Sequence, residues 1–351
     1  MSKTFGPRAR AVATVFVAAA LVAACGSSSS SSSSGAATNA AATSGKGADA
    51  GKHLKLAYLS FAVANSYDAP MLASAQAVAD SNNASITVFD ANNDPNKQFA
   101  QLQDVLTSGG YDGVILQPIE STNLIPLAQQ AISKHVGVAN IDQILGPKLD
   151  TFQKQVPGQN VNVTFVPTDI GTKLGQLVVK ACTERNLNPC NVGYLYDIKA
   201  SALDVAIRDS FNKAIASTPS VKVVAQGQDF FTPSQGLSAT QDMLQANPNL
   251  NLVVGSDQGI EGATQAVGKD KKVVLVGYGG SAAAQQGVSS GAWFGDVAQN
   301  PSTEGRVGTQ QLIQSIRNGT SPAAANALDD LPADGVMTKS NANEFHPEWP
   351  G

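Results

Sequence analysis

From residue 54 onward, the chain alternates short apolar segments with longer segments of helical periodicity. Short apolar runs between helices are typical of strands that are buried on both faces, and therefore of a parallel sheet. In the first half we expect strands at residues 54–59, 86–89, 113–116, 136–141 and 161–166, with helices at 71–82, 95–106 and 123–134. The pattern predicts an α/β fold.

The same alternation starts again in the second half. We expect helices at 173–183, 202–216, 234–245 and 259–267, with strands at 192–196, 221–224, 250–254 and 273–276. A chain of 351 residues has room for about two domains. Two successive α/β units of similar size predict two doubly wound parallel-sheet lobes, in which ligands bind beyond the carboxyl ends of the strands.

The first 25 residues have the order of a bacterial export signal. Basic residues precede an apolar run at 11–21, and small residues then precede Cys25. This order resembles the lipobox of a bacterial lipoprotein, in which Cys25 becomes the lipidated first residue; the alternative is a plain secretory signal with an incidental cysteine. We expect a signal peptide at 1–24, and at 25–52 the lipidated cysteine with a flexible linker rich in Ser, Gly and Ala. The rest of the chain would then lie on the extracytoplasmic face of the cell membrane, at the cell surface or in a periplasm.

Two cysteines remain after Cys25. Cys182 lies near the end of a predicted helix, and Cys190 lies just before a predicted strand. An oxidising compartment favours a disulfide between them, with two free thiols as the alternative. The three histidines lie far apart and lack metal-ligand spacing, so we expect no metal site.

The composition argues against nucleic acid as a partner. The formal net charge is −4, and no basic stripe could neutralise phosphates. The chain also has no H-E-x-x-H motif, and no histidine accompanies a plausible nucleophile at a strand end. We therefore expect a protein that is not an enzyme and that has no cofactor.

Amides, carboxylates and aromatic residues follow the predicted strands. They occur at 61–68, 90–95 and 142–143 in the first half, and at 197–199, 229–231, 256–258, 277–280 and 297–300 in the second. Such groups hydrogen-bond hydroxyls and pack against C–H groups, which favours a neutral polyhydroxylated ligand. The alternative is that each Asp or Asn only caps the following helix, which we prefer for Asp94 before Pro95.

Several of these segments also occur in one family of binding proteins. They are Asp90-x-x-x-Asp94-Pro95-x-Lys97-Gln98, Tyr-Asp-Gly-Val-Ile-Leu-Gln-Pro at 111–118, Val-Ala-Asn-Ile-Asp at 138–142, Gly-Tyr-Gly-Gly at 277–280 and Val-Ala-Gln-Asn-Pro at 297–301. With these motifs, residues 55–330 resemble the sugar-binding proteins of ABC importers, the ribose-binding-protein-like family of type I periplasmic solute-binding proteins. The resemblance implies two lobes joined by a three-strand hinge, with the ligand in the cleft between them. It implies an N-terminal lobe of 53–167 plus 300–327 and a C-terminal lobe of 168–298 plus 328–351.

The resemblance also implies a set of ligand-binding residues. Asn65, Tyr67, Asp142, Phe231, Asp257 and Gln299 match positions of that set. Asp68 stands where the family has a second aromatic residue, Gln143 replaces an arginine, Ser256 stands where asparagine is common, and Arg208 lies displaced from a second-lobe arginine. Gly279 occupies the place of a ligand-binding aspartate. Because an unpaired buried polar group costs about 1–3 kcal/mol, we expect a ligand shaped differently from ribose: another monosaccharide or a linear sugar alcohol.

Together these features predict a monomeric, lipid-anchored receptor. It would capture its sugar or sugar alcohol outside the cytoplasm and deliver it to the membrane permease of an ABC importer. Two alternatives stay open at this point. One is a sensory receptor that signals to a membrane kinase or chemoreceptor, and the other is an exported α/β enzyme that turns over its ligand through Asp142 or Asp257.

Overall fold

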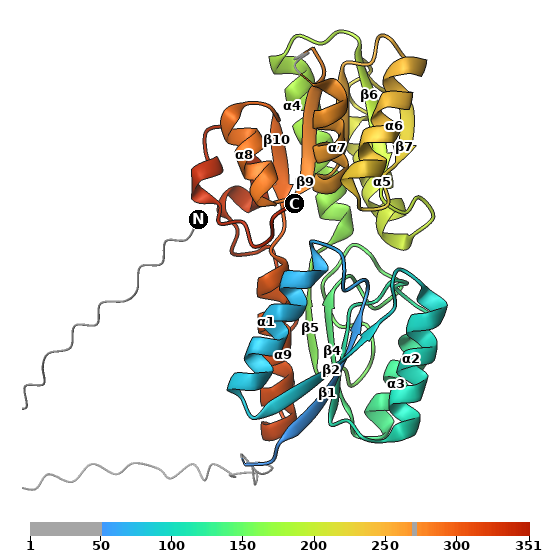
Figure 1. The fold of residues 1–351 in the computed structure, drawn as a ribbon, viewed down its shortest axis with the longest axis vertical. Coiled ribbons are helices and arrows are strands. Elements are labelled where there is room, and N and C mark those ends of the chain that lie inside the picture. Colours follow the sequence, from blue (N-terminus) through green and yellow to red (C-terminus); the bar gives the residue numbers. More distant parts are fainter. Residues whose placement is uncertain (1–50, 269–271) are drawn as a thin grey trace, which may run out of the picture. The chain divides into compact units, whose positions relative to one another are not determined.

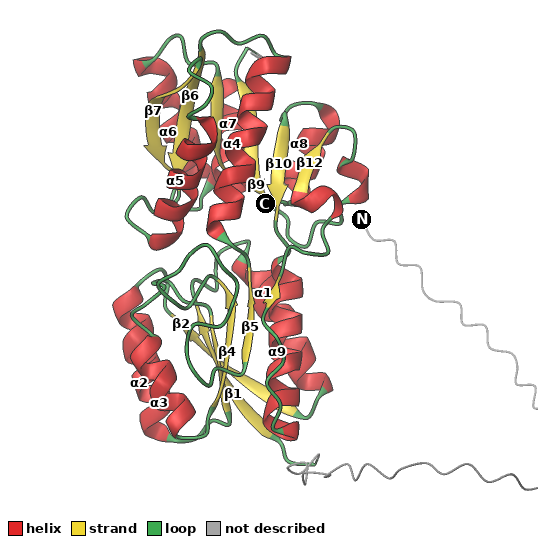
Figure 2. Ribbon diagram, turned by 180° about the vertical axis from the view of Figure 1, so that it is seen from behind, coloured by secondary structure: helices red, strands yellow, loops and turns green. Residues whose placement is uncertain are grey.

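A computed structural model describes residues 51–268 and 272–351 of the chain. These residues form two α/β lobes, each built on a six-stranded sheet with helices on both faces (Figures 1 and 2). The predicted fold class is therefore confirmed. The predicted signal peptide, Cys25 and nearly all of the linker lie outside the described residues. Within the described part, none of the helices has the length and apolar character needed to cross a membrane.

The sheet of the first lobe is parallel throughout. Its strands lie in the order β11-β5-β4-β3-β1-β2. Their bounds are β1 Leu54–Ser60, β2 Ala84–Asp90, β3 Gly113–Leu116, β4 Gly137–Asp142, β5 Val161–Thr164 and β11 Ala325–Asn326.

Four helices cover this sheet. In Figure 1, α1 (Asp68–Ser81) and α9 (Pro301–Asn318) lie together on one face, and α2 (Pro95–Ser108) and α3 (Ile125–Ser133) lie on the other. Although α9 follows nearly the whole second lobe in sequence, it packs closely on α1: a Cβ at Gly305 would lie 2.1 Å from the Met71 carbonyl oxygen. Ser74 Oγ also donates a hydrogen bond to the Ser302 carbonyl at 2.7 Å. Because Gly305 has no side chain, α9 can pack this closely against α1 of the first lobe.

Local sequence sets the ends of α2. The Asp94 side chain accepts hydrogen bonds from the backbone N–H groups of Asn96 and Lys97, and Pro95 occupies the first helical position. The helix ends at Gly109, whose φ of 64° is readily adopted by glycine. Asp94 thus caps a helix, as the sequence predicts.

Successive residues of β1 face opposite sides of the sheet and so contribute to two cores. Leu56 and Tyr58 pack beneath α1 and α9, with Leu312 of α9 in the same cluster. Ala57 and Leu59 pack beneath α2 and α3. All four β1 residues are fully buried, which explains why the strand reads as a continuous apolar run.

The second lobe repeats the arrangement with one difference. Its strand order is β12-β10-β9-β8-β6-β7, and β12 runs antiparallel to β10 whereas the other pairs are parallel. Its strands are β6 Cys190–Tyr196, β7 Val221–Gln228, β8 Leu252–Ser256, β9 Val274–Gly279, β10 Gly295–Ala298 and β12 Val336–Thr338. Its α-helices are α4 Pro167–Glu184, α5 Ala202–Ile215, α6 Pro233–Ala246, α7 Asp257–Val267 and α8 Ala282–Ser290. Two 3-10 helices, η1 Pro332–Gly335 and η2 Ala342–Glu344, flank β12.

The chain passes between the two sheets three times: after β5, after β10 and after β11. The third passage explains the direction of β12. The carboxyl end of β10 faces the first lobe, and the chain that returns from that lobe enters the second sheet from the same side. The strand β12 therefore runs opposite to its neighbour β10.

Several predicted boundaries differ from the structure. The helix expected at 173–183 begins at Pro167, and the strand expected at 161–166 ends at Thr164. The sequence pattern did not indicate α8, because only Ala284 and Val288 of that helix are buried and they form no wide apolar stripe. Cys182 and Cys190 form a disulfide between α4 and β6, with their Cα atoms 5.8 Å apart.

Candidate ligand-binding site

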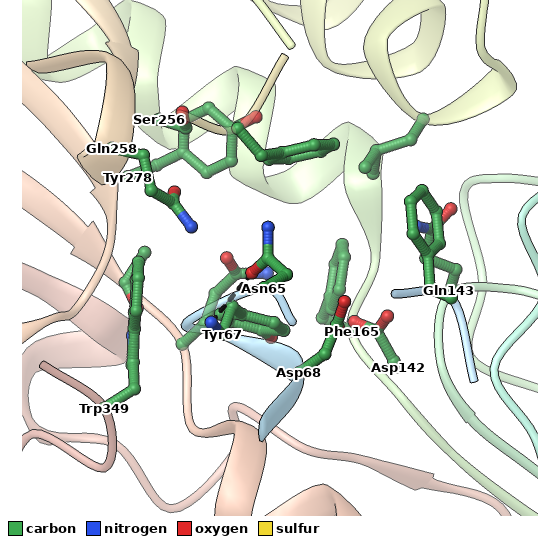
Figure 3. Close-up of a pocket in the computed structure, with 15 residues that line it drawn as sticks. Asn65, Tyr67, Asp68, Asp142, Gln143, Phe165, Ser256, Gln258, Tyr278 and Trp349 are labelled. Carbon is green, nitrogen blue, oxygen red and sulfur yellow. Dashed lines mark hydrogen bonds between the residues drawn. The ribbon is translucent and has the colours of Figure 1, made fainter. Parts of the chain in front are cut away.

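A cavity lies where the carboxyl ends of the strands of both sheets meet (Figure 3). The lining is rich in aromatic and polar side chains and draws on both lobes. It consists of Phe61, Asn65, Tyr67, Asp68, Asp142, Gln143, Phe165, Leu203, Phe231, Ser256, Gln258, Tyr278, Gly279, Gln299 and Trp349.

The loop between β1 and α1 brings Asn65 and Tyr67 to the cavity. Asn65 Oδ1 accepts a hydrogen bond from the Tyr67 backbone N–H at 2.8 Å, a local Asx turn that fixes the side chain. With its oxygen engaged, Asn65 presents its amide nitrogen to the cavity, as Figure 3 shows. The loop therefore offers a hydrogen-bond donor beside an aromatic ring.

A buried amide holds two carboxyl groups together at the floor of the first lobe. Gln117 Nε2 donates to Asp68 Oδ1 at 2.5 Å and to Asp142 Oδ2 at 3.0 Å. Gln117 Oε1 accepts from the Phe61 backbone N–H, which fixes the orientation of the amide. Asp142 ends β4 with a φ of 65°, a conformation that few residues other than glycine adopt at low cost. Figure 3 shows the two carboxyl groups side by side.

These carboxyl groups are hard to ionise together. Burial raises the pKa of Asp142 to about 7, although the hydrogen bond from Gln117 opposes the shift. Burial, and then the charge of Asp142, raise the pKa of Asp68 well above its usual range. Glu304, fully buried on α9, has its pKa raised by burial and by the charges of Asp142, Glu348 and Asp68. Neither of its carboxyl oxygens has a hydrogen-bond partner within the described part of the chain.

A strained turn after β7 places Phe231 in the cavity. Phe230 and Phe231 both have positive φ, 53° and 55°, which is unusual for bulky residues. Asp229 supports the turn, because its Oδ1 accepts from the Phe231 backbone N–H at 2.9 Å. The Phe231 ring meets Phe61 of the first lobe edge to face, with the ring centroids 6.2 Å apart, while Phe230 stays exposed. Such strain often occurs at binding sites, and here it orients an aromatic ring.

The second lobe also presents polar groups from β8, α7 and β9. Ser256 caps α7 by accepting from the Gly259 backbone N–H. Gln258 is only 3% exposed, and its Nε2 has no hydrogen-bond partner among the described residues. Figure 3 shows this nitrogen facing the open centre of the cavity. The Tyr278 hydroxyl is engaged, because it donates to the buried carboxyl of Asp197.

The last residues of the chain close one side of the cavity. Trp349 is 4% exposed, and its Nε1 donates to the Gly279 carbonyl at 2.8 Å. Its ring meets Tyr67 of the first lobe edge to face, with the centroids 5.3 Å apart. A Cβ at Gly279 would lie 2.7 Å from the Trp349 ring, and Gly279 has a φ of 144°. Glycine is thus required where the tryptophan crosses the strand end.

The neighbouring Glu348 ties the same segment to α9. Its carboxylate accepts from the Thr303 backbone N–H at 2.8 Å and from Thr303 Oγ1 at 2.6 Å. On the other side, the backbone N–H groups of Ala282 and Ala283 donate to the carbonyls of Trp349 and Pro350. The C-terminal segment 348–350 therefore contacts one helix start in each lobe.

The structure brings most of the predicted ligand-binding residues together and separates two of them. Arg208 does not line the cavity; its guanidinium pairs with Asp209 on the surface of α5, Nη2 to Oδ1 2.6 Å. Asp257 is buried behind the wall, where its Oδ2 accepts from the Ser281 backbone N–H at 2.7 Å. Its place at the start of α7 gives it a structural role in this arrangement. The predicted residues that do line the cavity are Asn65, Tyr67, Asp68, Asp142, Gln143, Phe231, Ser256 and Gln299.

Seven lining residues were not among the predicted ones. Four lie in segments already noted at strand ends, so their position was a usable signal: Phe61, Gln258, Tyr278 and Gly279. Phe165, Leu203 and Trp349 carried no such signal, because they belong to a crossover, to a helix start and to a tail without periodicity. Among the residues that the structure describes, no group of three or more His, Cys, Asp or Glu side chains is arranged to hold a metal ion.

Comparison with known proteins identifies a family. The model of the periplasmic binding protein domain matches residues 56–320. The ribose import binding protein RbsB of Haemophilus influenzae is 26% identical over 237 residues, which cover 67% of this chain and 76% of that protein.

Solved structures share the fold. A galactofuranose binding protein superposes with a TM-score of 0.71 at 18% identity, covering 83% of this chain and 96% of its own. The Caulobacter myo-inositol binding protein bound to myo-inositol superposes with a TM-score of 0.70 at 20% identity, covering 84% and 96%. At these identities the likeness concerns the fold alone.

Proposed function

Because the chain belongs to the periplasmic binding protein family, we propose that it captures a monosaccharide or sugar alcohol in the cavity between its lobes and delivers it to the membrane permease of an ABC importer. The relatives that it matches are binding proteins, and the chain is a binding protein rather than an enzyme.

The cavity itself carries this proposal, because both lobes supply its walls. Phe61 and Tyr67 of the first lobe face Phe231 and Trp349 of the second. Aromatic faces pack against the C–H groups of a sugar, while the lining amides exchange hydrogen bonds with its hydroxyls. A ligand that contacts both walls favours the closed arrangement of the lobes, and hinge closure of this kind is a common way to present an occupied site to a partner.

The ligand we propose differs from ribose, although several relatives are ribose import binding proteins. Two features support a difference. Gly279 has no side chain to offer a hydroxyl, and the Trp349 ring fills the adjoining space. Arg208 is turned away to Asp209, and the described lining residues of the second lobe include no arginine.

The location and the lobe boundaries are also proposals. We place the protein on the extracytoplasmic face of the cell membrane as a monomer, held by a lipid on Cys25 and by the linker to residue 52. We assign 53–167 with 300–327 to the N-terminal lobe and 168–298 with 328–351 to the C-terminal lobe. The sheet membership of β11 and β12 supports this division.

Native mass spectrometry of the purified protein, followed by calorimetric titration with pentoses, hexoses and sugar alcohols, tests the proposal. We expect one class to bind with 1:1 stoichiometry and to be recovered unaltered. Phe231→Ala should weaken that binding at least tenfold, because a buried ring contributes about 1.5–3 kcal/mol. Phe230→Ala is the matched control, since this neighbour shares the backbone conformation but is 54% exposed and does not line the cavity.

Chemical change of the bound ligand, or equal effects of the two Phe variants, would contradict the proposal. Uptake into membrane vesicles that hold the permease and its ATPase separates the importer from a sensory receptor, because only the importer moves ligand across the membrane.

A further inference from the structure

The charge of the cavity is unbalanced. Asp68 and Asp142 line it, and among its described lining residues there is no Lys, Arg or His. Behind them lies Glu304, whose two carboxyl oxygens have no partner within the described residues. The four ion pairs found in the described part all lie elsewhere: Lys52–Asp112, Lys173–Asp334, Lys180–Glu184 and Arg208–Asp209.

Helix ends offset only part of this charge. Asp68 is the first residue of α1, and Glu304 lies in the first turn of α9. A helix N-terminus carries about half a positive charge, so two of them cannot balance three carboxylates, and Glu348 already occupies the start of α9. No lysine, arginine or histidine among the described lining residues offsets the rest. Burial raises the pKa values of Asp68, Asp142 and Glu304, so a bound cation would compete with protons for these carboxyl groups.

The second-lobe wall of the cavity favours a hydrogen-bond acceptor in the ligand. Gln258 Nε2 is buried, has no partner among the described residues and faces the centre of the cavity (Figure 3). An N–H donor in this position requires an acceptor such as a hydroxyl or ring oxygen. The site can therefore accept a positive charge on its first-lobe side in exchange for a proton, and its second-lobe wall needs an oxygen acceptor.

From this juxtaposition of Asp68 and Asp142 with Gln258 across an aromatic cavity, we infer that the ligand is an aminated sugar or sugar alcohol, whose ammonium group binds both carboxyl groups from the cavity side. This inference rests on the proposed function and narrows its ligand class. An ammonium group donates three hydrogen bonds and brings the missing charge. Aromatic rings such as Tyr67 and Phe165 add the attraction that ring faces have for cations.

Three matched pairs of compounds test the inference on the purified protein by calorimetry. They are glucosamine with glucose, glucamine with glucitol, and an amino-deoxy-inositol with inositol. In at least one pair we expect the amine to bind ten times more tightly than its hydroxyl counterpart, or better. Binding of the amine should also release protons, measured in buffers of different ionisation heat. The titratable groups that face Asp142 are Asp68, Glu304, Tyr58 and Tyr67. Asp68 and Glu304 can share this release, whereas the two tyrosines stay protonated because their pKa values are raised above the usual range.

Substitutions at Asp142 and Asp68 test whether these two carboxyl groups cause the preference for the amine. Asp142→Asn should reduce the preference for the amine to threefold or less, and Asp68→Asn is the second variant if the first does not fold. Asp104→Asn is the control, because Asp104 is exposed on α2 and does not line the cavity; it should keep the full preference.

The outcomes are distinguishable. Binding of neutral compounds with no tighter binding of the amine in any of the three pairs overturns the amine assignment and leaves the solute-binding role intact. An amine preference that survives in both Asn variants overturns the placement at Asp68 and Asp142. Binding of neither class overturns the inference together with the proposed function.

Discussion

Replacement of Trp349 tests how far the C-terminal segment builds the binding site. The ring is 4% exposed, donates one hydrogen bond to the Gly279 carbonyl and packs on Tyr67 of the other lobe. Replacing a buried tryptophan by alanine costs about 3–5 kcal/mol, of which the aromatic pair accounts for about 0.5–1.5 kcal/mol and the hydrogen bond for about 1 kcal/mol. We expect Trp349→Ala to lower the free energy of unfolding by about 3 kcal/mol, and Trp349→Phe by about 1 kcal/mol.

Trp293 offers a matched control. It is 3% exposed, and its Nε1 donates to Thr264 Oγ1 at 2.8 Å, but it lies within the second lobe and does not line the cavity. Trp293→Ala should therefore destabilise the protein to a similar degree and leave the ligand dissociation constant unchanged. Trp349→Ala should in addition weaken ligand binding at least tenfold, because the ring is part of the cavity wall.

Urea unfolding followed by circular dichroism measures the first quantity, and calorimetry at a temperature where each variant is folded measures the second. Fluorescence is unsuitable, since each variant loses one of the two tryptophans. Two results would refute the reasoning. One is a loss of stability below 1 kcal/mol for Trp349→Ala, and the other is equal ligand affinity in the two Ala variants.

Three further predictions concern the stability of the lobes. Glu348→Ala should lower the free energy of unfolding by about 1–2 kcal/mol, because both carboxylate oxygens accept from Thr303 at the start of α9; urea unfolding measures this, and an unchanged midpoint would argue against the cap. The folded-state pKa of Asp142 is raised to about 7, above the roughly 3.9 of an unfolded chain, so its contribution to stability is fully present below pH 4 and lost as the pH rises through 7. Asp142→Asn should flatten that part of the pH–stability curve, and an unaltered slope would rule Asp142 out as its source. Replacing Cys182 and Cys190 by serine should cost about 2–3 kcal/mol, seen as a lower thermal midpoint that added reductant no longer shifts.

The sequence by itself determined the architecture. Burial on both faces forces the central strands to be continuous apolar runs, so segments such as Leu54–Ser60 and Gly113–Leu116 could be located before the structure was known. Parallel strands expose their carboxyl ends at one edge, so polar residues just after them could be assigned to a common cleft. That reasoning selected the segments that hold Asn65, Asp142 and Ser256, the family resemblance implied these three as ligand-binding residues, and all three line the cavity.

Only the tertiary structure decided which of these polar groups reach the cavity. Arg208 and Asp257 are close in sequence to lining residues, yet neither lines the cavity. Arg208 pairs with Asp209 on the surface, and the Asp257 carboxylate accepts a hydrogen bond from the Ser281 backbone N–H at the start of α8. No sequence pattern indicated that Trp349 lines the cavity, because its neighbours in space come from segments distant in the chain. Its place depends on the absence of a side chain at Gly279 and on the return of α9 to the first lobe. Local periodicity reports which face of an element is buried, but the balance of charge inside a cavity depends on side chains that only packing brings together.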